Sequence, residues 1–283
     1  MSAREDAFFI DCEEEALLAV LHLPPRPATL GVLIVVGGPQ YRVGAHRQFV
    51  LLARALAQSG FATLRFDYRG MGDATGEPRS FEAIQQDLKA AIDAFYRRLP
   101  GLQGVVLWGL CDAASAAACY ALIDSRIRSL VLANPWVRTE RGEARALLGH
   151  YYRRRLFDFE FWKKLAQGHV DWRSSLRSLG RALKSSRTSS ATSPTDLPQR
   201  MVKALSRRAC PTLIILSGND LVAAEFRTLA STHPEWRRYL KNPRVRVETR
   251  EDADHTFSCA TWRDEVADLT RAWMLDLTRL MNA

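Results

Sequence analysis

The sequence lacks long hydrophobic runs, paired cysteine motifs and a recognisable targeting segment. Apolar runs such as Val32–Val36 are far shorter than the roughly 20 residues that cross a bilayer. Residues 1–15 are acidic and do not follow the basic and then apolar pattern of a secretory signal, so we expect no such signal. The five cysteines are odd in number and show no C-x-x-C spacing, which favours reduced thiols in a cytoplasmic protein.

Sequence motifs for metals and nucleotides are also missing. None of the six histidines is combined with other ligands at the spacing of a metal site. The chain has no phosphate-binding loop and no dinucleotide-binding glycine fingerprint. We therefore expect neither a metal nor a nucleotide cofactor.

The charge of the chain is concentrated in one segment. Hydrophobic residues make up 47% and charged residues 25% of the 283 residues, which suits one large core and excludes a disordered chain. The net charge is +9, and residues 140–208 hold 16 Lys and Arg against 6 Asp and Glu. Such a segment attracts phosphates, acidic lipids or acidic polysaccharides, although a basic helical surface without a ligand is the simpler alternative. No nucleic-acid-binding module is visible, so no nucleic acid partner is expected.

Strand and helix patterns alternate outside this basic segment. Continuous apolar runs bounded by glycine indicate buried strands, and apolar residues three or four apart indicate helices. The predicted strands are 16–22, 31–36, 61–66, 104–108, 129–133, 212–216 and 244–249. The predicted helical segments are 46–58, 81–99, 109–123 and 262–280. This order predicts an α/β fold with a mostly parallel central sheet flanked by helices.

Residues 140–208 interrupt this order between the fifth predicted strand and the last two. They show basic and aromatic helical patterns and no strand pattern. We interpret residues 1–139 and 209–283 as one core, and residues 140–208 as a helical insertion with a mobile Ser-rich loop at 185–195.

The segment 105–115 carries the most informative motif. A buried strand runs into the turn G-L-C-D-A at 109–113 and then into a helix of small residues. This is the layout of a nucleophile elbow, where small residues two positions either side of the nucleophile relieve crowding. The N-terminus of the helix would favour the thiolate form of Cys111. The alternative is a buried structural thiol in an ordinary turn.

Two further polar residues follow strands in the chain order of a catalytic triad. Asp220 follows the predicted strand 212–216, and His255 lies in the loop after the strand 244–249. Carboxyl ends of parallel strands share one edge of a sheet, so we expect Cys111, His255 and Asp220 to meet there. His255 would deprotonate Cys111 and later protonate the leaving group, while Asp220 would orient the imidazole.

Each of these positions also has a simpler interpretation. Asp220 could cap the following helix, and His255 could be an ordinary residue of a surface loop. Asp252 and Asp254 are alternative acids, but they lie too close in sequence to His255 to approach it from a neighbouring strand.

An oxyanion hole would need two backbone N–H donors. The N–H of Asp112 is the first candidate, and the second is expected from the turn after the predicted strand 31–36. Pro39 has no N–H, so Gly38 or Gln40 must supply it, and both remain open.

Charged and aromatic residues around this site are candidates for substrate binding. The Asp112 carboxylate opposes a neighbouring thiolate, so we expect an arginine such as Arg42 or Arg47 to pair with it. Aromatic residues of the insertion could line an acyl pocket, and its cations could hold a phosphate or an acidic glycan. The candidates for binding substrate or anion are Arg42, His46, Arg47, Tyr151, Arg153 and Trp162.

Together these motifs resemble those of the alpha/beta-hydrolase superfamily, with the insertion in the position of a lid. The resemblance rests on the elbow, the 67–72 turn, the 217–220 turn and the His255 loop. More narrowly, segments 37–49 and 109–112 resemble the exosortase A system-associated hydrolases of type 1. That resemblance implies a bacterial protein encoded beside exopolysaccharide and protein-sorting machinery. In the wider superfamily, dienelactone hydrolases have a cysteine nucleophile.

The sequence therefore predicts an acyl hydrolase that acts on carboxylic esters or thioesters through an S-acyl enzyme. The expected substrate is a small-molecule, lipid or glycan acyl compound. Transfer of the acyl group to a glycan or lipid-linked acceptor is an alternative, and a binding protein with a vestigial site is another. The basic insertion could also contact an anionic membrane or an acidic polysaccharide peripherally.

Overall fold

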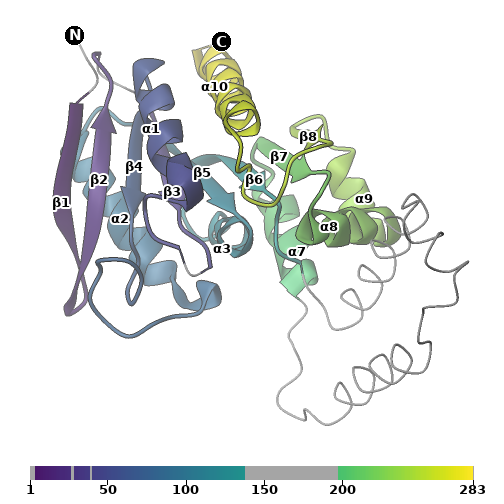
Figure 1. Cartoon of the computed structure of the whole chain (residues 1–283), viewed down its shortest axis with the longest axis horizontal. Coiled ribbons are helices and arrows are strands. Elements are labelled where there is room, and N and C mark those ends of the chain that lie inside the picture. Colours follow the sequence, from purple (N-terminus) through teal and green to yellow (C-terminus); the bar gives the residue numbers. More distant parts are fainter. Residues whose placement is uncertain (1–3, 27–28, 39, 138–196, 283) are drawn as a thin grey trace, which may run out of the picture.

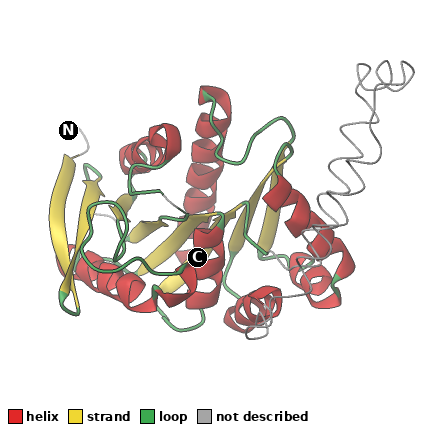
Figure 2. Cartoon of the chain, turned by 60° about the horizontal axis from the view of Figure 1, so that its bottom comes forward, coloured by secondary structure: helices red, strands yellow, loops and turns green. Residues whose placement is uncertain are grey.

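The computed structural model describes residues 4–26, 29–38, 40–137 and 197–282. Within these ranges the chain forms an eight-stranded sheet with helices on both faces (Figures 1 and 2). The strands are β1 (Arg4–Cys12), β2 (Glu15–Leu23), β3 (Leu30–Val35), β4 (Ala62–Phe66), β5 (Gly104–Leu110), β6 (Ile127–Ala133), β7 (Thr212–Ser217) and β8 (Val245–Arg250).

The sheet is antiparallel at one edge and parallel elsewhere. Its strand order is β1-β2-β4-β3-β5-β6-β7-β8. β2 pairs antiparallel with β1 and β4, and every pair from β4 to β8 is parallel. The carboxyl ends of β3, β5, β6, β7 and β8 therefore lie along one edge, as expected for an open α/β sheet with a site at that edge.

The helices complete the two outer layers. They are α1 (Gln48–Gln58), α2 (Gln85–Arg98), α3 (Asp112–Tyr120), α7 (Leu197–Arg208), α8 (Leu221–Thr232), α9 (Pro234–Leu240) and α10 (Ala260–Asn282), with short 3₁₀ turns at Ala45–Arg47 and Phe81–Ala83. α1 and α10 contact each other, and both contact Trp108 of β5. The Trp108 ring centroid lies 5.6 Å from that of Phe49, and its Nε1 lies 3.3 Å from the hydroxyl of Thr270. α3 packs against β5, β6 and α7.

The central strands are buried on both faces. All residues of β3, β4, β5 and β7 are buried, because helices cover the sheet on each side. This accounts for their continuous apolar sequences, which differ from the alternating pattern of a sheet with one wet face. The predicted α/β class and mostly parallel sheet are confirmed.

Three elements were not predicted. β1 was overlooked because its residues are largely exposed and charged, so the pattern resembles an acidic tail rather than a strand. The helices α8 and α9 were also missed between the last two strands. Since β1 adds a strand at the edge, the basic segment follows the sixth strand of the described chain, not the fifth.

The basic segment 140–208 is described only at its end. α7 belongs to it and packs on α3, with Met201, Val202 and Leu205 buried. Tyr151, Arg153, Trp162 and the Ser-rich loop 185–195 lie outside the described residues, so the division into core and lid stays a prediction. Among the described helices, none is long and apolar enough to cross a membrane.

Candidate active site

Cys111 occupies a sharp turn between β5 and α3. Its backbone angles are φ 61° and ψ −124°, a left-handed conformation that is costly for a residue with a side chain. A Cβ on Gly109 would lie 2.6 Å from the carbonyl carbon of Ala113, so the turn requires glycine there. The Cys111 N–H donates to the carbonyl of Ala133 at 2.9 Å, which ties the turn to β6. The half-buried thiol is thus held rigidly at the sheet edge.

Asp220 and His255 lie beside this turn. Nδ1 of His255 is 2.9 Å from Oδ2 of Asp220, although the N–H direction is bent away from a straight hydrogen bond. The Asp220 carboxylate also accepts the N–H groups of Val222 at 3.2 Å and Ala223 at 3.0 Å. Asp220 is therefore both the N-cap of α8 and the carboxylate next to the imidazole, and the two interpretations of its sequence position are compatible.

The imidazole lies between the carboxylate and the sulfur. The side chains of Asp220 and Cys111 raise the pKa of His255 to about 10, while partial burial opposes that rise. An imidazolium between two potential anions is the arrangement in which a cysteine–histidine pair exchanges a proton. The structure thus brings together the three side chains that the sequence predicted to meet.

The alternative acids occupy other positions. Asp252 is exposed. The Asp254 carboxylate accepts the N–H groups of Thr256 at 3.1 Å and Ser258 at 3.0 Å, so it holds its own loop together. Asp220 is accordingly the carboxylate that approaches the imidazole of His255 from a neighbouring strand.

A buried amide that sequence reasoning missed fixes the His255 loop. Asn134, directly after β6, donates from Nδ2 to the carbonyl of His255 at 3.0 Å and to Oγ of Ser217 at 2.9 Å. Its Oδ1 accepts the N–H of Ser217 at 2.8 Å, and the Ser217 hydroxyl donates to the carbonyl of Asp254 at 2.8 Å. Both side chains are fully buried. A polar residue at the end of a buried strand is the signal that could have revealed them.

The expected oxyanion-hole turn is in contact with Asp112. Oδ2 of Asp112 accepts the N–H of Gly38 at 3.0 Å, and Oδ1 accepts the N–H of Ala113 at 2.9 Å. A Cβ on Gly37 would come within 2.1 Å of the same carboxylate. Burial raises the pKa of Asp112, and hydrogen bonds from backbone N–H groups, including that of Asp112 itself, oppose the rise. The expected pairing of this carboxylate with an arginine is therefore wrong within the described residues.

The arginine next to this turn is bound elsewhere. Nη1 of Arg42 lies 2.5 Å from Asp67 and 2.6 Å from Asp73, and the Arg42 N–H donates to Asp67 at 2.6 Å. Its charge stabilises the 67–73 turn, so Arg42 is not a free anion-binding group in this structure. His46 and Arg47 are exposed and have φ values of 52° and 62°. The Gln40 side chain accepts the N–H of Ala45 at 3.2 Å.

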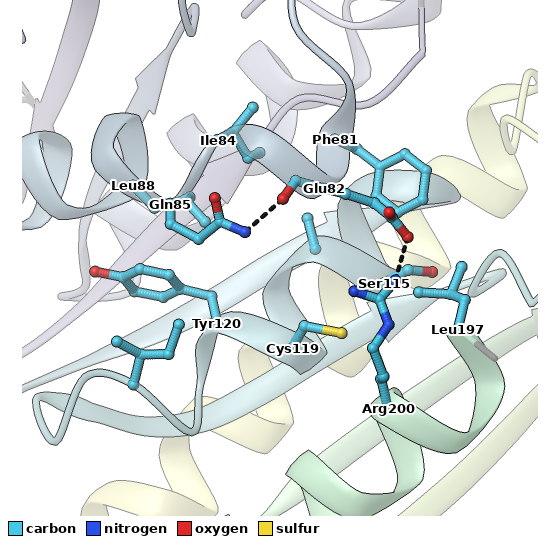
Figure 3. Close-up of a pocket in the computed structure, with 12 residues that line it drawn as sticks. Phe81, Glu82, Ile84, Gln85, Leu88, Ser115, Cys119, Tyr120, Leu197 and Arg200 are labelled. Carbon is cyan, nitrogen blue, oxygen red and sulfur yellow. Dashed lines mark hydrogen bonds and ion pairs between the residues drawn. The ribbon is translucent and has the colours of Figure 1, made fainter. Parts of the chain in front are cut away.

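A cavity of about 50 Å³ lies beside α3, between this helix, the Phe81–Ala83 turn and α7 (Figure 3). Ser115 and Cys119 line it one and two helical turns after Cys111, together with apolar side chains. Arg200 forms an ion pair with Glu82 at its rim. Within the described ranges, no group of three His, Cys, Asp or Glu side chains could hold a metal ion.

Comparisons with known proteins give this fold a family. The family described as "Alpha/beta hydrolase family" matches residues 32–269, which contain all three side chains. Quorum-quenching protein AidA of Acinetobacter baumannii is 29% identical over 133 residues, which cover 44% of this chain and 42% of AidA. The matched segments span less than half the length of the curated relatives.

Solved structures share the architecture at low sequence identity. Esterase Pf2001 of Pyrococcus furiosus has a TM-score of 0.67 at 16% identity, over 97% of this chain and 91% of the esterase. Dienelactone hydrolase of Anabaena variabilis has a TM-score of 0.63 at 18% identity, over 98% of this chain and 99% of that enzyme. At such identities these likenesses show a common fold.

Proposed function

The chain belongs to the alpha/beta hydrolase family, and we propose that it hydrolyses carboxylic esters or thioesters through a cysteine nucleophile. Cys111 is the proposed nucleophile, His255 the proton carrier and Asp220 the residue that orients the imidazole. The observation that supports this most is the 2.9 Å approach of Asp220 to the His255 ring, whose pKa the side chains of Asp220 and Cys111 both raise.

The proposed reaction begins with transfer of the thiol proton from Cys111 to His255. The sulfur attacks the carbonyl carbon, a C–S bond forms, and the carbonyl oxygen takes the π-electron pair as an oxyanion. Collapse of this intermediate breaks the bond to the leaving group, which takes the proton from His255. The product of this half-reaction is a thioester on Cys111.

Water completes the cycle. His255 takes a proton from a water molecule, whose oxygen attacks the thioester carbonyl and forms a second oxyanion. Collapse breaks the C–S bond, releases the carboxylic acid and returns the proton to the sulfur. The His255 imidazole serves both halves because Asp220 holds one ring nitrogen and leaves the other toward the sulfur.

Acyl transfer is a second proposal for the same intermediate. A thioester reacts with amines and thiols as well as with water, so an acceptor bound at the site would compete with hydrolysis. The 16 Lys and Arg of residues 140–208 favour an acidic or phosphate-bearing acceptor. Together with the resemblance to exosortase-associated hydrolases, they support a bacterial exopolysaccharide precursor as the natural substrate or acceptor.

Replacing the nucleophile tests the proposal. Cys111→Ala should lower kcat/KM for 4-nitrophenyl esters by about 10³-fold or more, because every covalent step needs the sulfur. Intact mass spectrometry of the wild type, quenched during turnover, should show one acyl group that peptide mapping assigns to Cys111.

Cys119→Ala is the matched control. Cys119 lies two turns further along α3 and is also half-buried, so its removal tests for a nonspecific thiol reaction. This variant should keep wild-type turnover and the acyl adduct. Wild-type activity in a folded Cys111→Ala variant would refute the cysteine mechanism. Product analysis with an added glycan acceptor separates transfer from hydrolysis.

A further inference from the structure

The Asp112 carboxylate is hydrogen-bonded to the turn after β3, which is expected to supply one donor of the oxyanion hole. Its two oxygens accept the N–H groups of Gly38 at 3.0 Å and Ala113 at 2.9 Å. The N–H of the residue after the nucleophile and one N–H of the turn after β3 are the donors of an oxyanion hole in this layout. In the resting structure a carboxylate therefore occupies the Gly38 N–H, which is one of the two candidate donors of that turn.

The surroundings of this carboxylate show that the contact is built into the fold. A Cβ on Gly37 would come 2.1 Å from Oδ1, so only glycine lets the turn close onto Asp112. Among the described residues no arginine or lysine forms an ion pair with Asp112, and backbone N–H groups hold its charge instead. The first turn of α3 adds the favourable end of a helix dipole.

We propose that the Asp112 side chain is a plug of the oxyanion hole, which rotates away from the Gly38 N–H before an ester carbonyl is bound for attack. The carboxylate and an oxyanion cannot both be bound by the Gly38 N–H, since a backbone amide has one hydrogen. The plug rests on the proposed function, because it has a role only if an oxyanion forms beside Cys111. Moving the Asp112 carboxylate away from its backbone contacts costs free energy in every catalytic cycle.

This arrangement makes Asp112 a determinant of specificity. A substrate with a hydroxyl or a cation near the displaced carboxylate compensates for the lost N–H contacts, because a carboxylate accepts hydrogen bonds and pairs with cations. A simple ester offers neither, so the plug selects against it. The chemical class favoured is an acyl compound with a hydroxyl or amino group near its carbonyl, such as an acylated sugar.

Removing the carboxylate tests the plug. Asp112→Ala leaves the backbone N–H in place and opens the hole, so kcat/KM for 4-nitrophenyl acetate should rise about tenfold, the change that corresponds to 1.4 kcal/mol. A trifluoromethyl ketone, which forms a hemithioketal anion on a cysteine, should bind Asp112→Ala more tightly by a similar factor. Asp112→Asn keeps the size without the charge and should show a smaller rise in both measurements.

Asp252→Asn is the control for a general effect of negative charge. Asp252 is an exposed carboxylate in the His255 loop, and its neutralisation should leave both measurements within about twofold of the wild type. An equal rise in Asp252→Asn would overturn the plug, as would a fall or no change in Asp112→Ala. If Asp112→Ala does not fold, Asp112→Asn decides, and activity no higher than wild type overturns the proposal.

Cys111→Ala separates this proposal from the proposed function. If the wild type forms no adduct with the trifluoromethyl ketone that depends on Cys111, the cysteine mechanism itself fails. If the adduct depends on Cys111 and Asp112→Ala gains nothing, only the plug fails.

Discussion

Two clusters of polar side chains follow the strands β4 and β5, and they differ in how completely their polar groups are bound to one another. After β4, the buried Arg69 forms paired hydrogen bonds with Asp87, at 3.0 Å from Nε and 2.9 Å from Nη2, and contacts Glu13. After β5, the half-buried Cys111 has a left-handed backbone and a thiol next to His255. The first set is called the Arg69 cluster here, and the second the Cys111 site.

The difference lies in how completely the polar groups are bound. In the Arg69 cluster the Arg69 N–H also bonds Asp87, at 2.9 Å, and both side chains are at most 1% exposed. A bidentate pair of this kind restrains a turn and offers nothing to a ligand. At the Cys111 site the His255 side chain is one-third exposed, and the strained turn presents the sulfur at the sheet edge. Charge alone therefore does not distinguish a site. The Cys111 site differs by a partly exposed imidazole and a thiol in a strained turn.

Breaking the Arg69 cluster should have the largest effect on stability. Arg69→Met leaves the buried Asp87 carboxylate without its partner and should lower the free energy of unfolding by about 3–5 kcal/mol. Urea unfolding at pH 7 measures this loss.

The double variant Arg69→Met with Asp87→Leu is the control for the Arg69 cluster. Since replacing a buried pair by apolar residues is often nearly neutral, it should recover most of the stability. Below the unfolding transition, esterase activity per folded molecule should stay at wild type in both variants. A selective loss of turnover at unchanged stability would show that the Arg69 cluster belongs to the site.

Loss of the Asn134 amide should affect turnover by an intermediate amount. Under the proposed function Asn134 is a positioning residue, since it holds the His255 carbonyl and, through Ser217, the Asp254 carbonyl. Asn134→Ala should lower kcat about 10–100-fold with little change in KM, because small displacements of a catalytic group are costly. The pH profile of Cys111 alkylation should shift as well, since the imidazole is no longer held beside the sulfur.

Ser129→Ala is the matched control for Asn134. Ser129 is a fully buried residue of β6 whose hydroxyl donates to the Pro211 carbonyl at 2.7 Å and accepts the Trp273 Nε1–H at 2.9 Å. Its loss should lower the free energy of unfolding by about 1–3 kcal/mol and leave kcat unchanged. An equal drop of kcat in the two variants would assign Asn134 a purely structural role.

The sequence was most informative where local chemistry and strand order agree. The strained turn at Cys111 could be predicted because G-L-C-D-A lies between a buried strand and a small-residue helix, and because Asp220 and His255 follow later strands in the chain order of a triad. β1 could not be predicted in the same way, since an exposed edge strand lacks the apolar run that marks a buried one.

The orientation of single polar side chains was the second limit. The sequence places Asp112 at the start of a helix, where a carboxylate can turn to solvent, to an arginine or to backbone N–H groups. Which of these three partners the carboxylate takes depends on how closely the turn that contains Gly37 approaches Asp112 in the folded chain. Asn134 is followed by proline and looks like an ordinary turn residue, and its burial depends on β7 and the His255 loop, both distant in sequence.

The smallest expected effect is a pH dependence that separates the two clusters. The pKa of His255 is raised to about 10, so the folded state binds this proton more tightly than the unfolded chain, where the pKa is about 6.5. The resulting stabilisation is complete below pH 6.5 and is lost as the pH rises through about 10. Because the side chain is one-third exposed and screened by solvent, we expect about 1 kcal/mol.

Urea unfolding at pH 6 and pH 10.5 measures this dependence as the stability difference between the wild type and His255→Ala. That difference should shrink by about 1 kcal/mol at the higher pH. The difference between the wild type and Arg69→Met should stay constant over the same interval, since the hydrogen bonds with Asp87 raise the pKa of Arg69 even further above this range. A constant difference for His255→Ala would mean that its imidazole is not held as a cation between Asp220 and Cys111, and the contrast between an open site and a saturated cluster would lose its electrostatic basis.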